Sequence, residues 1–326
     1  MSISHNSHTH LTRGYAAALL SAVILSTTGV LIRYLTEAYQ LPALILAFWR
    51  DLIVALMMLP LLALLRPKLL HISRQHLPYL LIYGLILAAF NALWTLSVAL
   101  NGAAIATVLI YSSAGFTVLL GWWLLQESLD WARITAVIVT LSGCVLVADA
   151  LSPDAWQTNL LGIITALLSG LGFAVYSLMG RSASQRGLNP WTTLLYTFSF
   201  AAGFLLLINL IPGSHLPEQA ARPKDMFWLG SSAIGWLILF LLGAGPTLAG
   251  YGAYNVALTY LPSGVVNLIV TLEPAFTAVF ATIFLHERLT NIQIVGSITI
   301  MSGVVFLRIY EGWAIKRGKT APVHTL

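Results

Sequence analysis

The sequence predicts an all-α membrane protein of about ten transmembrane helices, arranged as two inverted repeats of five helices each. Three observations support this fold class. Long apolar stretches recur along the chain, charged residues make up only 8% of it, and two pairs of segments match each other in the same order. A soluble domain carries roughly 25% charged residues. Such a shortfall is typical of a chain that is surrounded mostly by lipid.

Ten stretches have the length and apolar character of membrane spans, since a helix needs about 20 mostly apolar residues to cross the hydrocarbon core. They are 14–34, 43–65, 78–98, 103–125, 132–150, 160–180, 191–211, 236–258, 264–285 and 292–310. Turn-forming pairs separate them, among them Leu41-Pro42, Asn101-Gly102, Asn189-Pro190 and Leu261-Pro262. The connections are too short to hold a soluble domain.

The basic residues predict how the chain is oriented. Lys and Arg accumulate in cytoplasmic loops. With the N-terminus in the cytoplasm, the cytoplasmic segments hold Arg13, Arg66, Lys68, Arg74, Arg133, Arg181, Arg186, Arg308, Lys316, Arg317 and Lys319. The outer segments hold only Arg33, Arg222, Lys224 and Arg288. We therefore expect a multi-pass protein of the cell (inner) membrane with both termini cytoplasmic. The net charge of +5 does not indicate nucleic acid binding, because the basic residues are spread over short loops and a tail.

Two internal matches indicate a duplication. The run Gly14-Tyr-Ala-Ala-Ala18-Leu-Leu-Ser21 matches Gly162-Ile-Ile-Thr-Ala166-Leu-Leu-Ser169, and further on Phe116-Thr117 and Ser142-Gly143 match Phe276-Thr277 and Ser302-Gly303. The predicted organisation is a cytoplasmic tail (1–13), a first repeat (14–150), a second repeat (159–310) and a basic cytoplasmic tail (311–326).

The number of helices in each repeat predicts the relation between the two halves. Five is odd, so the second half enters the membrane in the opposite direction. Inverted repeats are the plan of many secondary transporters, whose site lies near the midplane between the halves. Duplication for packing alone is the alternative.

A set of short motifs in this order resembles the EamA-type transporters of the drug/metabolite transporter superfamily. The motifs are Phe48-Trp49-Arg50, Leu272-Glu273-Pro274-Ala275-Phe276, His286-Glu287-Arg288-Leu289 and Gln126-Glu127-Ser128-Leu129. The resemblance covers about residues 14–310. It implies ten helices in two inverted repeats and transport of small metabolites, often export of amino acids. The first half departs from the second by having Ser113-Ala114 opposite Glu273-Pro274, so the halves do not contribute equivalent carboxylates.

Arg50 and Glu273 are the principal candidates for the transport site, because ionisable groups at membrane depth are costly and usually functional. At 1.5 Å per residue, Arg50 lies about 12 Å from the outer end of its span and Glu273 about 15 Å from the inner end of its own, so the two are at similar depth. A salt bridge, two ends of one site for a zwitterion, or a static pair that fixes packing are all open. Adjacent helical residues point about 100° apart, so we expect Asp51 to be a poor partner for Arg50.

Helix breaks and cavity-lining side chains complete the predicted pathway. Pro246 and Pro274 interrupt the eighth and ninth spans, which marks the second half as the moving or binding half, with a packing kink as the alternative for Pro246. Polar or aromatic side chains on possible cavity faces are Asn91, Trp94, Tyr111, Tyr251, Tyr254 and Asn255, with helix packing as the alternative for each.

No enzyme or cofactor motif emerges. Gly170-x-Gly172 lies inside an apolar helix without a preceding strand, so it is no nucleotide loop. The histidines His5, His8 and His10 lie in a polar tail, and we expect neither a metal nor a cofactor. Ser112-Ser113 has no nearby base for nucleophilic catalysis.

The sequence thus predicts a secondary transporter that moves a small metabolite outward, an amino acid or an amphipathic relative above all. The expected partners are this small-molecule substrate, protons as coupling ions and the lipid bilayer. Alternatives are an importer of a small organic solute or vitamin, a non-transporting membrane protein and an intramembrane enzyme.

Overall fold

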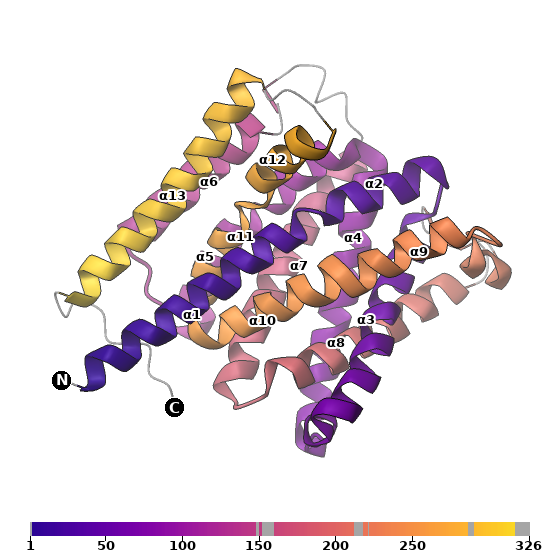
Figure 1. Ribbon diagram of the computed structural model, residues 1–326, viewed down its shortest axis with the longest axis horizontal. Helices are drawn as coiled ribbons and strands as arrows, with labels where there is room; N and C mark the ends of the chain where they lie inside the picture. The colour runs from indigo at the N-terminus through magenta and orange to yellow at the C-terminus, as the bar shows by residue number, and fades with distance from the viewer. Residues whose placement is uncertain are drawn as a thin grey trace.

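The computed structural model describes residues 2–147, 150–151, 160–211, 218–220, 222–285 and 290–316, and every regular element in these ranges is a helix (Figure 1). The first half contains α1 (Ser2–Leu25), α2 (Thr28–Ala38), α3 (Ala43–Leu65), α4 (Leu77–Ile110), α5 (Ser113–Leu125) and α6 (Trp131–Val147). The second half contains α7 (Leu160–Gln185), α8 (Pro190–Leu210), α9 (Ala233–Leu242), the π-helix η5 (Gly243–Gly250), α10 (Tyr251–Tyr260), α11 (Ser263–Val270), α12 (Glu273–Leu285) and α13 (Asn291–Lys316). Short 3₁₀ helices lie in the connections: η1 (Pro67–Leu70), η2 (Arg74–His76) and η4 (Pro223–Phe227).

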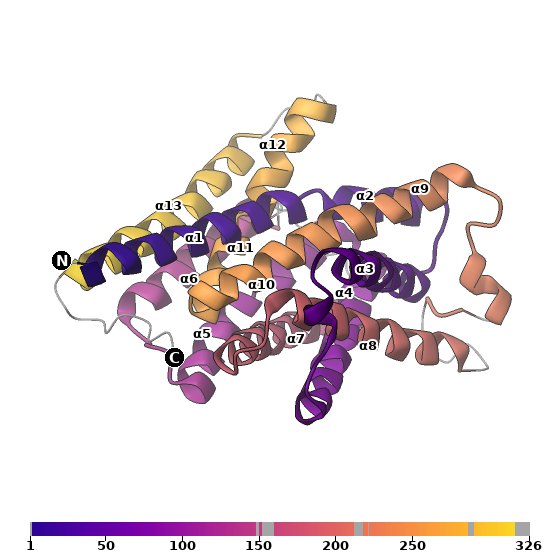
Figure 2. The ribbon, with the colours of Figure 1, turned by 60° about the horizontal axis from the view of Figure 1, so that its bottom comes forward.

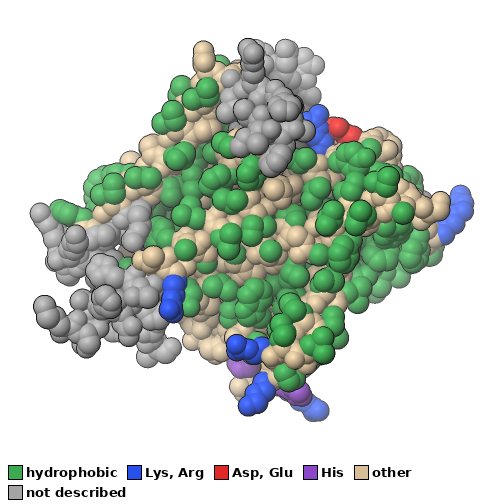
Figure 3. Space-filling view, in the orientation of Figure 1, with side chains coloured by type: hydrophobic (Ala, Val, Ile, Leu, Met, Phe, Trp, Pro, Cys, Tyr) green, Lys and Arg blue, Asp and Glu red, His purple; other side chains and the backbone are tan. Residues whose placement is uncertain are grey.

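Length and composition make this a multi-pass membrane protein. Six helical segments are long and apolar enough to cross a membrane, and four shorter apolar helices accompany them within the described residues. Large apolar side chains face outward, as Leu64 does with 83% of its surface exposed. Figure 3 shows hydrophobic side chains over most of one face, with charged side chains toward its edges. In lipid this surface needs no polar cover.

The chain reverses direction within α4. Ser97 donates to the carbonyl of Gly162, near the start of α7, whereas Ser169 further along α7 donates to the carbonyl of Phe90. If α4 were straight, the residues after Ser97 would extend beyond Leu160, the first residue of α7. Instead, the carbonyl of Ile110 lies beside Gly170. The third and fourth predicted spans are therefore distinct, and the turn lies between Ser97 and Ile110.

Helix breaks occur in both halves, which corrects the expectation that they belong to the second half alone. In the first half, α1 ends at Leu25 before α2 begins at Thr28, and α4 ends at Ile110 before α5 begins at Ser113. At both breaks a serine hydroxyl bonds the backbone of the preceding turn. Ser26 donates to the carbonyl of Val23 (2.6 Å) and Ser112 to that of Leu109 (2.6 Å). Side chains that bond the backbone of the preceding turn compete with regular helix.

The second half has two further irregularities, at the predicted prolines. Pro246 lies inside η5, where the wider π-turn accommodates its missing N–H. The ninth span is divided between α11, which ends at Val270, and α12, which begins at Glu273. Pro274 is thus in the first turn of α12, where proline is tolerated.

Two groups of helices pack around the centre. α4 lies against α7, α8 and α3, while α1 runs alongside α10, as both ribbon views show (Figure 2). α13 packs along α6 at one edge of the molecule, where small residues permit close approach. A side chain at Gly143 would meet Ile300, and one at Gly303 would meet Thr140.

Candidate functional site

A central cavity of about 60 Å³ lies where the interrupted helices meet. Its lining residues come from both halves: Leu25, Thr28, Arg50, Phe90, Trp94, Ile110, Tyr111, Phe173, Thr247, Tyr251, Val270 and Glu273. Leu25 and Thr28 flank the first break, Ile110 and Tyr111 the second, and Val270 and Glu273 the third, while Thr247 lies in η5. Irregular backbone at membrane depth is tolerated where it borders a cavity. The three helix breaks and η5 therefore all border this one cavity.

Arg50 is the cation of this cavity. Its side chain projects from α3 and is 2% exposed, and its guanidinium lies 5.8 Å from the ring centre of Trp94. The Nε atom is 3.5 Å from Oδ1 of Asp51. Nε and Nη2 are buried and make no hydrogen bond. An arginine has five N–H donors, so donors remain for a ligand.

Asp51 is the partner of Arg50, and the expectation that the two would not meet was wrong. The 100° between adjacent Cβ directions does not prevent contact, because the arginine side chain is long enough to bring its Nε within 3.5 Å of the neighbouring carboxylate. Asp51 is fully buried, and the Nδ2 atom of Asn91 lies 3.0 Å from both of its carboxylate oxygens. Asn91 thus lies behind Arg50 and outside the cavity lining.

Glu273 is the acidic group in the cavity lining. It is the first residue of α12, where the helix dipole favours a negative charge. The hydroxyl of Tyr111, from the first half, lies within hydrogen-bonding range of its carboxyl group. Among the described residues the ion pairs are Arg33–Glu37 and Arg50–Asp51, so Arg50 and Glu273 share the cavity without being joined in a salt bridge.

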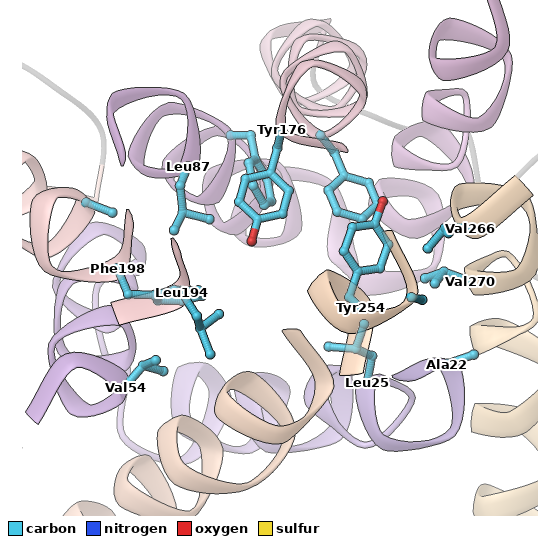
Figure 4. Close-up of a cluster of buried hydrophobic side chains, with 14 of the residues drawn as sticks. Ala22, Leu25, Val54, Leu87, Tyr176, Leu194, Phe198, Tyr254, Val266 and Val270 are labelled. Carbon is cyan, nitrogen blue, oxygen red and sulfur yellow. The ribbon is translucent and has the colours of Figure 1, made fainter. Parts of the chain in front are cut away.

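The structure separates the predicted aromatic and amide residues into two groups. Trp94, Tyr111 and Tyr251 line the cavity. Tyr254 and Asn255 lie deeper, where Asn255 donates to the hydroxyl of Tyr176 (3.1 Å). Figure 4 shows Tyr176 and Tyr254 among buried apolar side chains.

A buried polar cluster adjoins the cavity on the predicted cytoplasmic side and was not found from the sequence. At its centre, Asn267 of α11 accepts a hydrogen bond from Ser113 (3.1 Å) and donates to Thr117 (3.0 Å) and Ser177 (3.2 Å). Ser177 in turn bonds the hydroxyl of Tyr254 (2.5 Å). We call these five residues the Asn267 cluster. The signal that could have revealed it is a lone amide within the apolar run of α11.

A second polar contact joins α11 to the first half. Oε1 of Glu127, in the connection after α5, accepts hydrogen bonds from the backbone N–H and the hydroxyl of Ser263, both at 2.9 Å. Glu127 therefore satisfies free donors at the start of α11. The matching Glu287 lies outside the described residues.

The described residues contain no group of three His, Cys, Asp or Glu side chains that could hold a metal ion. The side chains of His5, His8 and His10 lie outside the described part of the chain.

Comparison with known proteins gives a consistent set of relatives. The EamA-like transporter family matches residues 12–148 and again 160–309. The chain is 30% identical to the threonine/homoserine exporter RhtA of Salmonella typhimurium, over 76% of this chain and 77% of that protein. It is 25% identical to a probable amino-acid metabolite efflux pump of Escherichia coli, over 88% of this chain and 92% of that protein. A solved crystal structure with 16% sequence identity has the same fold, with a TM-score of 0.72 over 93% of this chain and 97% of the other.

Proposed function

Because the chain belongs to the EamA-like transporter family, we propose that it exports a small zwitterionic metabolite of the amino-acid class through the cell (inner) membrane by alternating access. The observation that carries the proposal is the central cavity, to which both halves contribute and in which Arg50 and Glu273 are the charged lining residues. The names of two relatives, an amino-acid metabolite efflux pump and a threonine/homoserine exporter, support the substrate class and the direction.

The chemistry of the lining suits a ligand with two opposite charges. The N–H groups of Arg50 that bond no protein atom can donate to a ligand carboxylate in the planar geometry that guanidinium favours. Glu273 can receive an ammonium group, or a proton when no ligand is bound. Leu25, Phe90 and Val270 offer apolar surface to the rest of the ligand.

We attribute the rearrangement to two inverted repeats, and reciprocal contacts support this attribution. In a two-fold interface, if one residue contacts a second, their mates contact each other as well. Gly143 approaches Ile300 and Gly303 approaches Thr140; both glycines and both partners differ in number by 160.

A second reciprocal pair joins other helices. Ser21 donates to the carbonyl of Gly250 (2.9 Å) and Ser169 to that of Phe90 (3.0 Å). The two donors are the last residues of the matched runs, and the two acceptors differ in number by 160.

In this proposal the structure represents a state closed on the predicted cytoplasmic side. The Asn267 cluster and the Glu127–Ser263 contact both join α11 to the α5 segment there. Thr277, which matches Thr117 in the other half, donates instead to the carbonyl of Ser26 (2.9 Å). Rocking of the halves would break one set of contacts and form its counterpart.

The test is transport of radiolabelled threonine by the purified protein in liposomes, from about pH 5.5 to about pH 8. We expect Glu273→Gln to insert and fold but to lose the pH dependence, because the amide keeps the shape and cannot exchange a proton. Glu37→Gln is the matched control, since Glu37 lies in an exposed surface pair with Arg33. An unchanged pH profile in Glu273→Gln would rule out proton coupling at this residue, and absence of threonine transport by the unmodified protein would refute the substrate class.

A further inference from the structure

The ionisable groups at the cavity form an unequal set. Arg50 supplies one positive charge, since guanidinium stays protonated in proteins. Asp51 lies directly behind it, with Oδ1 3.5 Å from Nε, and is fully buried. Glu273 is the remaining acidic group at the cavity. The three residues together carry a charge between zero, with Glu273 protonated, and −1.

From this charge balance we infer that Asp51 determines the specificity of the site: it cancels the charge of Arg50, so that the cavity admits ligands of net charge zero or +1 and rejects net anions such as dicarboxylic amino acids. The inference rests on the proposed function and names the substrate class of the same site. Asp51 acts through Arg50 and does not line the cavity, so it is a positioning residue.

The surroundings of Asp51 fit this role. Its carboxylate faces Arg50 on one side and receives the amide of Asn91 on the other, with Nδ2 3.0 Å from both oxygens. These contacts hold the carboxylate against the Nε edge of the guanidinium. The Arg50 side chain lines the cavity, and its Nη2 makes no hydrogen bond to a protein atom, so Arg50 keeps N–H donors for a ligand carboxylate. Arg50 can therefore bind one ligand carboxylate by hydrogen bonding. Because the net charge of the site is zero or −1, it does not attract a second carboxylate on the same ligand.

The charge rule has an expected size. With Glu273 ionised the site carries a charge of −1, and two unit charges about 10 Å apart, at an effective dielectric constant of about 20, interact strongly enough to change binding by about tenfold or more. Glutamine and glutamate have nearly the same shape and differ by one negative charge. We therefore expect unlabelled glutamine to compete with labelled threonine at least about tenfold better than glutamate does.

The variants test whether Asp51 is the cause. Asp51→Asn raises the charge of the site by one and should reduce the glutamine-to-glutamate preference by about tenfold. The double variant Arg50→Gln with Asp51→Asn restores the original sum and should again reject glutamate, although it binds both ligands more weakly. Glu37→Gln removes the carboxylate of the exposed Arg33–Glu37 pair, which does not line the cavity, and should leave the preference unchanged.

The outcomes are distinguishable. If the unmodified protein transports threonine but glutamate competes as well as glutamine, the inference is overturned and the proposed function stands. An unchanged preference in a folded Asp51→Asn protein likewise overturns it. If Asp51→Asn does not fold, the comparison of glutamine with glutamate in the unmodified protein decides. Absence of threonine transport by the unmodified protein overturns the proposed substrate class and, with it, this inference.

Discussion

Replacing Asn267 by leucine should open the predicted cytoplasmic side of the protein. Asn267 is fully buried and its amide makes three hydrogen bonds, to Ser113, Thr117 and Ser177. Leucine has the same branching at Cγ and can make none of them. Hydrogen bonds between membrane helices contribute about 0.6 kcal/mol each on average. Three of them amount to about 2 kcal/mol, which would shift the balance toward an inward-open state by about 30-fold.

Cysteine labelling from the cytoplasmic side measures this shift. Val266 precedes Asn267 in α11 and is fully buried, so Val266→Cys reports when the closed contact opens. The native Cys144, which is buried, is first replaced by serine. In inside-out vesicles, a membrane-impermeant maleimide should label the reporter about 30-fold faster when Asn267→Leu is also present, if opening limits the rate.

A matched control separates opening from general destabilisation. Asn209 is also a buried amide; its Nδ2 donates to the carbonyls of Leu44 and Leu205, at the other end of the bundle from α11. We expect Asn209→Leu to lower stability while leaving the labelling of Val266→Cys slow. Equal labelling rates in the two variants, or no acceleration by Asn267→Leu, would refute the assignment of the Asn267 cluster as the closed gate.

Two further predictions concern topology and packing. Reporters fused after Arg74 and after Lys319 should be cytoplasmic and one near Glu218 external, because Lys and Arg favour cytoplasmic loops; a cytoplasmic signal at Glu218 would contradict the ten-span arrangement. Gly143→Leu should destabilise the protein in detergent by about 1–3 kcal/mol through overpacking against Ile300. Gly203→Leu is the control, since an added side chain there meets nothing within 4 Å, and similar losses in both variants would show that the α6–α13 contact is not the cause.

The helices themselves could be predicted because membrane spans depend on composition and length, both of which are local properties of a sequence. The reversal within α4 follows from the same reasoning. The apolar stretches before and after Asn101-Gly102 are each long enough to cross the membrane once, so the chain must turn between them. The prolines likewise marked the irregularities at η5 and before α12, because proline lacks a backbone donor wherever it occurs.

The contacts between helices were harder to predict from the sequence. The breaks at Ser26 and Ser112 were missed because serine is common in regular membrane helices, and similar bonds to a preceding carbonyl occur within unbroken helices, as at Ser177 and Ser199. The Arg50–Asp51 pair was excluded by a rule about Cβ directions that ignores the reach of a long side chain. The role of Asn267 depends on three partners, from α5 and α7, that no pattern near it in the sequence reveals.

The way in which the fourth and ninth spans are broken has a consequence for motion. At Ser112 the hydroxyl and the backbone N–H both donate to the carbonyl of Leu109, and thermal motion can break and reform such bonds. At Pro274 the ring permanently removes a donor, so the backbone there cannot regain a continuous hydrogen-bond ladder. The break between α4 and α5 can therefore change its backbone bonding, whereas the break between α11 and α12 is permanent. In the proposed transport cycle the chain would thus bend mainly at the break beside Tyr111, and the break before Glu273 would keep its shape.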